Sequence, residues 1–259
     1  MPPRDFPMTS PVPEITDRIS CVICAFNEAP RIADVLAVAS THPLLYEVIV
    51  VDDGSTDNTV EIVRRFPSVT LISYAVNKGK SSAMATGIAM AQCELLMLLD
   101  ADLKGLTHEH VTALATPVLL GEASVSISLR QNSLSIFRAI GLDFVSGERV
   151  ISKELVSNLL GEIHLLPRFG IEVFMNRQII ARRLSIAVTD WPQVTQSRKT
   201  EKMGYRKGIM AELRMVADLL QVTYPLVLIS QTYHLRSLRV AISPIRRLEA
   251  TGFTRSETT

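Results

Sequence analysis

Apolar strand-like runs alternate with helix-like segments through the first hundred residues, and this alternation strongly limits the possible fold. We predict strands over residues 19–25, 47–51, 69–74 and 94–99, and helices over residues 30–40, 57–66 and 81–91. Such a series requires parallel strands joined by right-handed crossovers, with helices covering the sheet. The chain is therefore expected to form an α/β fold.

Each predicted strand is followed by polar residues. In chain order these are Asn27-Glu28, Asp52-Asp53-Gly54-Ser55, Asn77-Lys78-Gly79-Lys80 and Asp100-Ala101-Asp102. Ligands of open parallel sheets bind beyond the carboxyl ends of the strands. The four segments should therefore line one edge of the sheet, where a nucleotide would bind.

The last of these strands leads directly into two acidic residues, Asp100 and Asp102. In the turn that leaves a strand, two carboxylates can converge on one hard divalent cation. An aspartate turn or a helix cap is the alternative. The other three polar segments favour the metal site, because a bound nucleotide diphosphate would need a cation.

The second and third polar segments carry the residues expected to contact a nucleotide. An ionised carboxylate accepts hydrogen bonds from ribose hydroxyls or from a base N–H, and Asp53 is the predicted contact. Asp52 is either a second contact or a support for loop N–H groups, and Asp57 is explained more simply as a helix cap. Lys78 and Lys80 either meet a diphosphate or belong to a solvated basic loop.

Charge and composition exclude several other classes of protein. The formal net charge is only +1, which gives no reason to expect a nucleic acid partner. Cys21, Cys24 and Cys93 lie in apolar segments, so we interpret them as core residues of a protein in a reducing compartment. Residues 1–18 are expected to be a disordered lead-in rather than a signal peptide. No apolar run reaches the length of about 18 residues that a membrane-spanning helix needs.

Together the four polar segments resemble the family 2 glycosyltransferases, which have the GT-A fold. The family patterns appear here as Cys24-Ala25-Phe26-Asn27-Glu28, as Val51 to Asp57, as Asn77 to Ala83 with Ser81 replacing a glycine, and as Asp100-Ala101-Asp102. The resemblance covers about residues 19–104, the nucleotide-sugar-binding half of the domain. It implies a Rossmann-like, mostly parallel central sheet flanked by helices.

This resemblance also implies an activity, the transfer of a hexose from a nucleoside diphosphate sugar with inversion. It places Mg²⁺ or Mn²⁺ on Asp100 and Asp102 and makes Asp102 a catalytic residue, because the cation neutralises charge on the leaving diphosphate. The implied contacts with the nucleotide sugar are Ala25, Asn27, Glu28, Asp53, Lys80, Asp100 and Ala101.

Residues 105–192 are expected to form the acceptor-binding half of the same domain. Residues 146–154 and 169–173 resemble segments of polyprenyl-phosphate glycosyltransferases. The resemblance makes Arg130 and Arg149 contacts for a phosphate-bearing acceptor, in the first instance polyprenyl phosphate, and makes Glu172 a base or an orienting residue.

The residues of this half also have simpler explanations. Arg149 would then pair with Glu148 or Glu154 at the surface, and Glu172 would only favour the start of a helix. Leu103-Lys104 stands where polyprenyl-phosphate mannosyltransferases commonly carry an amide that binds the metal.

Residues 193–259 are expected to form a basic helical extension, with one helix over 209–221. Its apolar segment 219–235 is a core helix, a strand or a segment against a bilayer. Cations around that segment favour docking at an anionic membrane surface, which would place a cytoplasmic protein at the membrane face. A helical hairpin that joins two subunits of a homodimer is an equally economical prediction. His234 is a candidate for an additional metal ligand.

Three other functions remain open at this level. A glucosyl-phosphoglycerate synthase would use the same donor chemistry with a small soluble acceptor. A nucleotidyltransferase would also use an α/β sheet and metal-binding carboxylates, but Ala25-Phe26-Asn27-Glu28 contains no glycine for a phosphate-binding loop. A non-catalytic module that binds nucleotide sugars is the third possibility.

Overall fold

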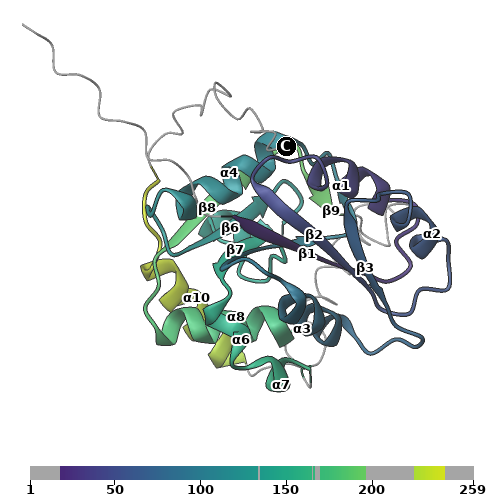
Figure 1. The fold of residues 1–259 in the computed structure, drawn as a ribbon. Coiled ribbons are helices and arrows are strands. Elements are labelled where there is room, and N and C mark those ends of the chain that lie inside the picture. Colours follow the sequence, from purple (N-terminus) through teal and green to yellow (C-terminus); the bar gives the residue numbers. More distant parts are fainter. Residues whose placement is uncertain (1–17, 134, 165, 167–169, 197–224, 243–259) are drawn as a thin grey trace, which may run out of the picture.

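A central sheet of seven strands organises the structure (Figure 1). The computed structural model describes residues 18–133, 135–164, 166, 170–196 and 225–242. The strand order is β3-β2-β1-β4-β7-β6-β8. Strand β7 runs antiparallel to both of its neighbours, and the other neighbouring pairs are parallel. The predicted α/β fold with a mostly parallel sheet is confirmed.

The first half of the chain follows the predicted alternation. Its elements are β1 (Ile19–Ala25), α1 (Ile32–Ala39), β2 (Leu45–Asp52), α2 (Thr59–Val63), β3 (Val69–Ser73), α3 (Lys80–Met90) and β4 (Leu95–Asp100). Helix α1 begins later than predicted because a turn precedes it, in which Arg31 N and Ile32 N both donate to Glu28 O, at 2.9 and 3.0 Å.

The second half contributes the other strands and most of the helices of one face. Its elements are β5 (Leu103–Lys104), α4 (His108–Leu119), β6 (Val125–Arg130), α5 (Ser135–Ile140), β7 (Arg149–Ser152), α6 (Glu154–Ser157), α7 (Leu160–Ile163), α8 (Gly170–Ala181), β8 (Ile186–Trp191), β9 (Thr195–Gln196) and α10 (Pro225–Ser237). Strand β8 pairs with β6 along its whole length, from Ile186 opposite Val125 to Trp191 opposite Arg130. The apolar segment 219–235, which the sequence left open, forms a helix from residue 225.

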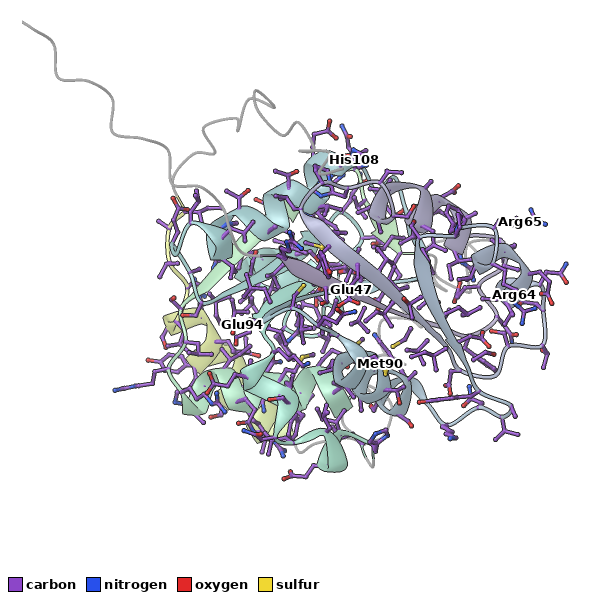
Figure 2. All side chains as sticks on the ribbon, viewed as in Figure 1. Glu47, Arg64, Arg65, Met90, Glu94 and His108 are labelled. Atoms are coloured by element: carbon purple, nitrogen blue, oxygen red, sulfur yellow. The ribbon has the colours of Figure 1, made fainter. Side chains whose placement is uncertain are left out.

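Two apolar layers attach the helices to the sheet. Alternate residues of a strand point to opposite faces. Val22 of β1 therefore belongs to the layer beneath α3, α8 and α10, whereas Ile23 belongs to the layer beneath α1 and α4. Arg64 and Arg65, which follow α2, lie on the outside of the molecule (Figure 2).

Helix α3 approaches the sheet closely at Gly87. A Cβ atom at this position would lie 2.3 Å from Cγ1 of Val22 in β1. The glycine therefore sets the distance between α3 and the sheet, and with it the place where the start of α3 meets the carboxyl ends of the strands.

The last described residues pack against the edge of the sheet. Helix α10 contacts α8, and the residues that follow it join β8, where Ile186 N donates to Leu238 O and Val240 N donates to Ile186 O, both at 2.9 Å. Across the described ranges, none of the helices combines the length and hydropathy needed to cross a membrane. Residues 1–17 of the expected lead-in, and the predicted helix over 209–221, lie outside the described residues.

Candidate active site

Polar residues from both halves of the chain meet at one edge of the sheet. Strand β1 lies between β2 and β4, with Cys24 opposite both Val51 and Asp100, so these three strands end at the same level. Strand β7 is antiparallel to β4 and pairs its first residue, Arg149, with Leu98. The start of β7 and the ends of the parallel strands therefore form one continuous edge.

The loop after β1 is fixed to the loop after β2. Asn27 has a positive φ of 56°, which a short amide side chain tolerates better than most. Its Oδ1 accepts a hydrogen bond from Thr56 N at 2.8 Å, and its backbone N–H donates to Ser55 Oγ at 2.9 Å. Glu28 accepts a hydrogen bond from Arg31 Nε at 2.7 Å. The predicted nucleotide contacts Asn27 and Glu28 thus lie at the edge with their side chains already oriented.

Both acidic residues at the end of β2 support neighbouring loops. Asp53 is 4% exposed, and its two oxygens accept the backbone N–H groups of Lys78 at 2.7 Å and Gly79 at 2.9 Å. Asp52 accepts hydrogen bonds from Ser55 N and Ser73 Oγ. The loop support expected of Asp52 as one of two roles is therefore found for both residues, and contact of Asp53 with a nucleotide stays a prediction.

Lys80, the first residue of α3, bridges the two halves of the site. Its Nζ lies 2.9 Å from Asp100 Oδ1 and 2.9 Å from Glu172 Oε1. Burial alone would lower the pKa of Lys80, but the two carboxylates raise it well above the usual value. Burial likewise opposes ionisation of Asp100, yet Lys80 and Arg130 hold the pKa of its carboxyl below the ordinary value. The pair therefore remains charged.

Asp102 has the opposite electrostatic environment. Burial, reinforced by the charges of Asp100 and Glu28, raises the pKa of Asp102 to about 7. A carboxylate in this position lacks a sufficient counter-charge, and a divalent cation between Asp102 and Asp100 would supply one. Mg²⁺ commonly takes only one or two carboxylates and completes its shell with substrate phosphates. The residues present therefore fit a cation of this kind.

The cation site would rest on these two aspartates. Among the described residues, no group of three or more histidine, cysteine, aspartate or glutamate side chains is arranged to hold a metal ion. His234, the candidate additional ligand, lies exposed on α10, where Nδ1 contacts Ser230 O at 2.7 Å. Its assignment as a metal ligand is not supported.

Arg130 lies at the edge but is enclosed by acidic residues. It is 7% exposed, and its Nη1 donates to Glu148 Oε1 at 2.8 Å. A second nitrogen, Nη2, lies 3.6 Å from Asp143 Oδ2, and Nη1 lies 3.8 Å from Asp100 Oδ2. The Arg130 charge is thus balanced within the protein, and its contact with an acceptor phosphate stays a prediction.

Arg149 is fully buried. Its guanidinium donates to Ser146 O, at 2.5 Å from Nη2, and to Asn176 Oδ1 at 3.3 Å. The alternative surface pairing with Glu148 or Glu154 is wrong, because Arg149 is buried, Glu148 pairs with Arg130 and Glu154 pairs with Arg182. Arg149 is positioned to organise the chain around Ser146, and an acceptor would reach it only after a rearrangement.

Glu172 occupies the third position of α8, as the helix-start explanation requires, but it also belongs to the site. It is 1% exposed, and its Oε2 has no hydrogen-bond partner. An acceptor hydroxyl would need access to this carboxylate before Glu172 could act as its base. The geometry instead gives Glu172 a role in orienting Lys80.

The sequence did not predict the contacts that Gly147 and Gln196 make with Asp100. A Cβ atom at Gly147 would lie 2.5 Å from Asp100 Oδ1, so the backbone of residue 147 closes directly over that carboxylate. Gln196 in β9 donates from Nε2 to Asp100 Oδ2 at 3.0 Å. The glycine of Ser146-Gly147 was a signal for close approach, whereas nothing near Gln196 in the sequence points to Asp100. Ala25 and Ala101 are only 2% and 3% exposed, so they can contact a ligand mainly through their backbone.

Comparison with protein families agrees with this geometry. Residues 20–134 match the model of Glycosyl transferase family 2. A poly-beta-1,6-N-acetyl-D-glucosamine synthase from Staphylococcus epidermidis is 38% identical over 88 residues, which cover 32% of this chain and 21% of the relative. The chain thus spans about a fifth of the length of this curated relative.

Two further relatives extend over most of the chain. A dolichyl-phosphate beta-glucosyltransferase from Trichomonas vaginalis is 24% identical over 254 residues, which cover 82% of this chain and 76% of the relative. The crystal structure of glucosyl-3-phosphoglycerate synthase from Mycobacterium tuberculosis in complex with Mn²⁺, UDP-glucose and phosphoglyceric acid aligns with a TM-score of 0.61 at 24% identity, covering 80% of this chain and 79% of the other. The structural match confirms the fold.

Proposed function

Because residues 20–134 match the model of Glycosyl transferase family 2, we propose that this chain belongs to that family and moves a hexose from a nucleoside diphosphate sugar to a phosphate-bearing acceptor, with inversion. We propose polyprenyl phosphate as that acceptor. The observation that carries the proposal is the cluster of Lys80, Asp100 and Asp102 at the carboxyl edge of the sheet, where a parallel α/β sheet binds its ligand.

On the donor side, Asp100 and Asp102 would hold Mg²⁺ or Mn²⁺. The cation, when bound, neutralises the charge that develops on the departing nucleoside diphosphate. Lys80 keeps Asp100 ionised and fixes one of its oxygens, so that the carboxylate is ready for the cation. The segments 25–28 and 52–53 line the same edge and supply backbone and side-chain acceptors for the nucleoside.

On the acceptor side, the burial of Glu172 favours a nucleophile that is already an anion. A phosphate oxygen can attack the anomeric carbon without losing a proton, whereas a hydroxyl needs a base. Glu172 is 1% exposed and engaged by Lys80 at 2.9 Å, so it is poorly placed to take a proton from an acceptor. This argument supports a phosphate acceptor over a sugar or glycerate hydroxyl.

The relatives support the same range of acceptors. The relative that covers 82% of the chain is named a dolichyl-phosphate glucosyltransferase, and a phosphoglyceric acid complex is among the similar structures. Transfer to a small phosphorylated acceptor is therefore the second candidate function. A lipid acceptor would further require docking at a membrane face, which we assign to the basic region 193–259.

The two candidates can be separated by identifying the product. Purified protein is incubated with UDP- and GDP-hexoses and with either polyprenyl phosphate in detergent or 3-phosphoglycerate, and the extracts are analysed by mass spectrometry. We expect a hexosyl polyprenyl phosphate, formed with Mn²⁺ or Mg²⁺ and absent in EDTA or with Asp102→Asn. A product on 3-phosphoglycerate alone would establish the second candidate. Failure of the protein to bind or use any nucleotide sugar would contradict both.

A further inference from the structure

Gln196 lies between Arg130 and Asp100, the first of the two aspartates of the proposed cation site. Its Oε1 accepts a hydrogen bond from Arg130 Nη1 at 2.9 Å, and its Nε2 donates to Asp100 Oδ2 at 3.0 Å. One amide group thus links Arg130 directly to Asp100, the first of the two aspartates.

The orientation of this amide is determined by its neighbours. A guanidinium has no acceptor atom, so the side of Gln196 that faces Arg130 must be Oε1, and the NH₂ group must face the carboxylates. Arg130 is itself fixed by Glu148, at 2.8 Å, and by Asp143, at 3.6 Å. The direction of the two N–H donors is therefore set by a chain of buried charges.

The backbone of Gln196 is fixed as well. Asn132 accepts from Gln196 N at 3.1 Å and donates to Gln196 O at 2.7 Å. Residue 196 also pairs with Leu103, which immediately follows Asp102 in the chain. The strand that carries the amide and the turn that carries the carboxylates thus move as one unit.

We propose that Gln196 is a positioning residue of the cation site. Its NH₂ group fixes Asp100, and the pairing of residue 196 with Leu103 fixes the turn that carries Asp102, so that both carboxylates are oriented before Mg²⁺ or Mn²⁺ arrives. The role of that cation in sugar transfer rests on the proposed function, but the binding of the cation alone does not. Groups that orient metal-binding carboxylates in this way commonly change metal affinity or activity by about 10–100-fold when removed.

The test measures the affinity for Mn²⁺ alone, by electron paramagnetic resonance of free Mn²⁺ over the purified protein. Gln196→Met keeps the length of the side chain and removes its hydrogen bonds. Gln92→Met is the matched control, because Gln92 also donates to a carboxylate, that of Glu47 at 3.3 Å, but lies at the opposite end of the strands. We expect the dissociation constant for Mn²⁺ to rise about 10–100-fold in Gln196→Met and to stay within about twofold of the wild type in Gln92→Met.

Kinetics and a second variant distinguish positioning from a general loss of structure. With a nucleotide sugar that the wild type uses as substrate, the Mn²⁺ concentration for half-maximal rate should rise about tenfold in Gln196→Met. The kcat of this variant at saturating Mn²⁺ should stay within about twofold of the wild-type value. Asn132→Ala removes the two hydrogen bonds from the Asn132 side chain to the Gln196 backbone and leaves the Gln196 side chain intact. This variant should also weaken Mn²⁺ binding. If Gln196→Met does not fold, Asn132→Ala is used in its place to test the proposal.

The outcomes separate this inference from the proposed function. If the wild type binds Mn²⁺ and transfers sugar but Gln196→Met and Asn132→Ala bind Mn²⁺ equally well, the positioning role of Gln196 is overturned and the function stands. If the wild type binds no Mn²⁺, both are overturned. If Mn²⁺ binds with the expected difference but no nucleotide sugar is used, the role of Gln196 stands and the function does not.

Discussion

The Lys80 ammonium lies between the carboxylates of Asp100 and Glu172, with an oxygen of each 2.9 Å from Nζ. Lys80→Met would leave Glu172, which is 1% exposed, without the ammonium group that lies 2.9 Å from its Oε1. An unsatisfied buried acceptor costs about 1–3 kcal/mol, so we expect a loss of that order in the free energy of unfolding, measured by urea denaturation. Adding Glu172→Gln should recover part of it, because the charge that needed compensation is removed.

A double-mutant cycle makes this prediction quantitative. The coupling energy between positions 80 and 172 should fall within about 0.5–3 kcal/mol. Lys78→Met is the control, since Lys78 is exposed and only lies over the ring of Tyr74, at 4.4 Å from its centroid. The control should cost no more than about 1 kcal/mol. Additive effects at positions 80 and 172 would show that the ion pair contributes nothing to folding.

Residue spacing predicted where the site lies better than it predicted what each residue does. The order of strands requires that Asp53, Lys80 and Asp100 share one edge, because all follow strands of a parallel series. Hydrogen-bond partners depend on tertiary contacts instead. Gln196 and Asp100, for example, are 96 residues apart in the chain. Arg149 is buried because it begins the antiparallel strand β7, which the sequence motifs did not predict.

At the scale of the elements, the junction of α1 and α4 should make stability depend on pH. His42 follows α1, is 4% exposed, and has Nε2 at 3.2 Å from His108 O and 3.0 Å from Thr112 Oγ1. His108 stands at the start of α4 (Figure 2). Nδ1 of His42 accepts a hydrogen bond from Leu44 N at 3.2 Å, so His42 is neutral with its proton on Nε2. Burial, with a smaller effect of the His108 charge, lowers the pKa of His42 from 6.5 to about 4, although Glu109 opposes the shift.

The sign of the effect follows from proton uptake. Between pH 6.5 and 4 the unfolded chain binds a proton at His42 and the folded protein does not, so the free energy of unfolding falls as the pH falls. The loss at His42 amounts to about 1.4 kcal/mol per pH unit within that window. His42→Gln should remove this contribution, so the difference between wild type and variant should shrink from pH 7.5 to pH 4.5 in urea unfolding. An unchanged difference over this range would contradict the neutral, buried histidine.

The packing of α3 on β1 makes a second prediction at this scale. Gly87→Ala would gain about 1 kcal/mol of helix propensity. The added Cβ would lie 2.3 Å from Cγ1 of Val22, and overpacking of this kind costs about 1–3 kcal/mol. We expect net destabilisation by thermal unfolding, and a smaller effect of Gly87→Ala in a Val22→Ala background. A variant more stable than wild type would show that α3 can move outward without cost.

The elements that the sequence predicted are the long apolar strands and the helices between them, since their pattern is local. No element was predicted over residues 105–124, yet α4 occupies most of them. Its first turn is closed by Thr107 and the His110 ring, at 2.9 Å, rather than by a glutamate or glutamine, and Pro117 lies within it. Strand β7 has four residues, and its antiparallel direction depends on the space between β4 and β6.

For the whole molecule, the consequence of this topology is that one sheet joins both halves of the chain through β4 and β7. The contacts of Asp100 cross that boundary: Lys80 comes from the first half, whereas Arg130 and Gln196 come from the second. The donor site therefore cannot be complete in residues 19–104 alone. Of these three partners, Gln196 lies outside residues 20–134, the stretch that matches the family model.

A cation bound by Asp100 and Asp102 should stabilise the entire fold. Since the unfolded chain does not hold Asp100 and Asp102 together, Mn²⁺ binds mainly the folded state, and a hundredfold excess over its dissociation constant should add about 2.7 kcal/mol. Thermal unfolding of the full chain in EDTA and in increasing Mn²⁺ measures the effect as a rising midpoint. Asp102→Asn should abolish the rise while changing the midpoint in EDTA little or upward, because a carboxyl whose pKa burial raises to about 7 is itself costly to ionise. A midpoint that rises equally in Asp102→Asn would place the cation elsewhere in the protein.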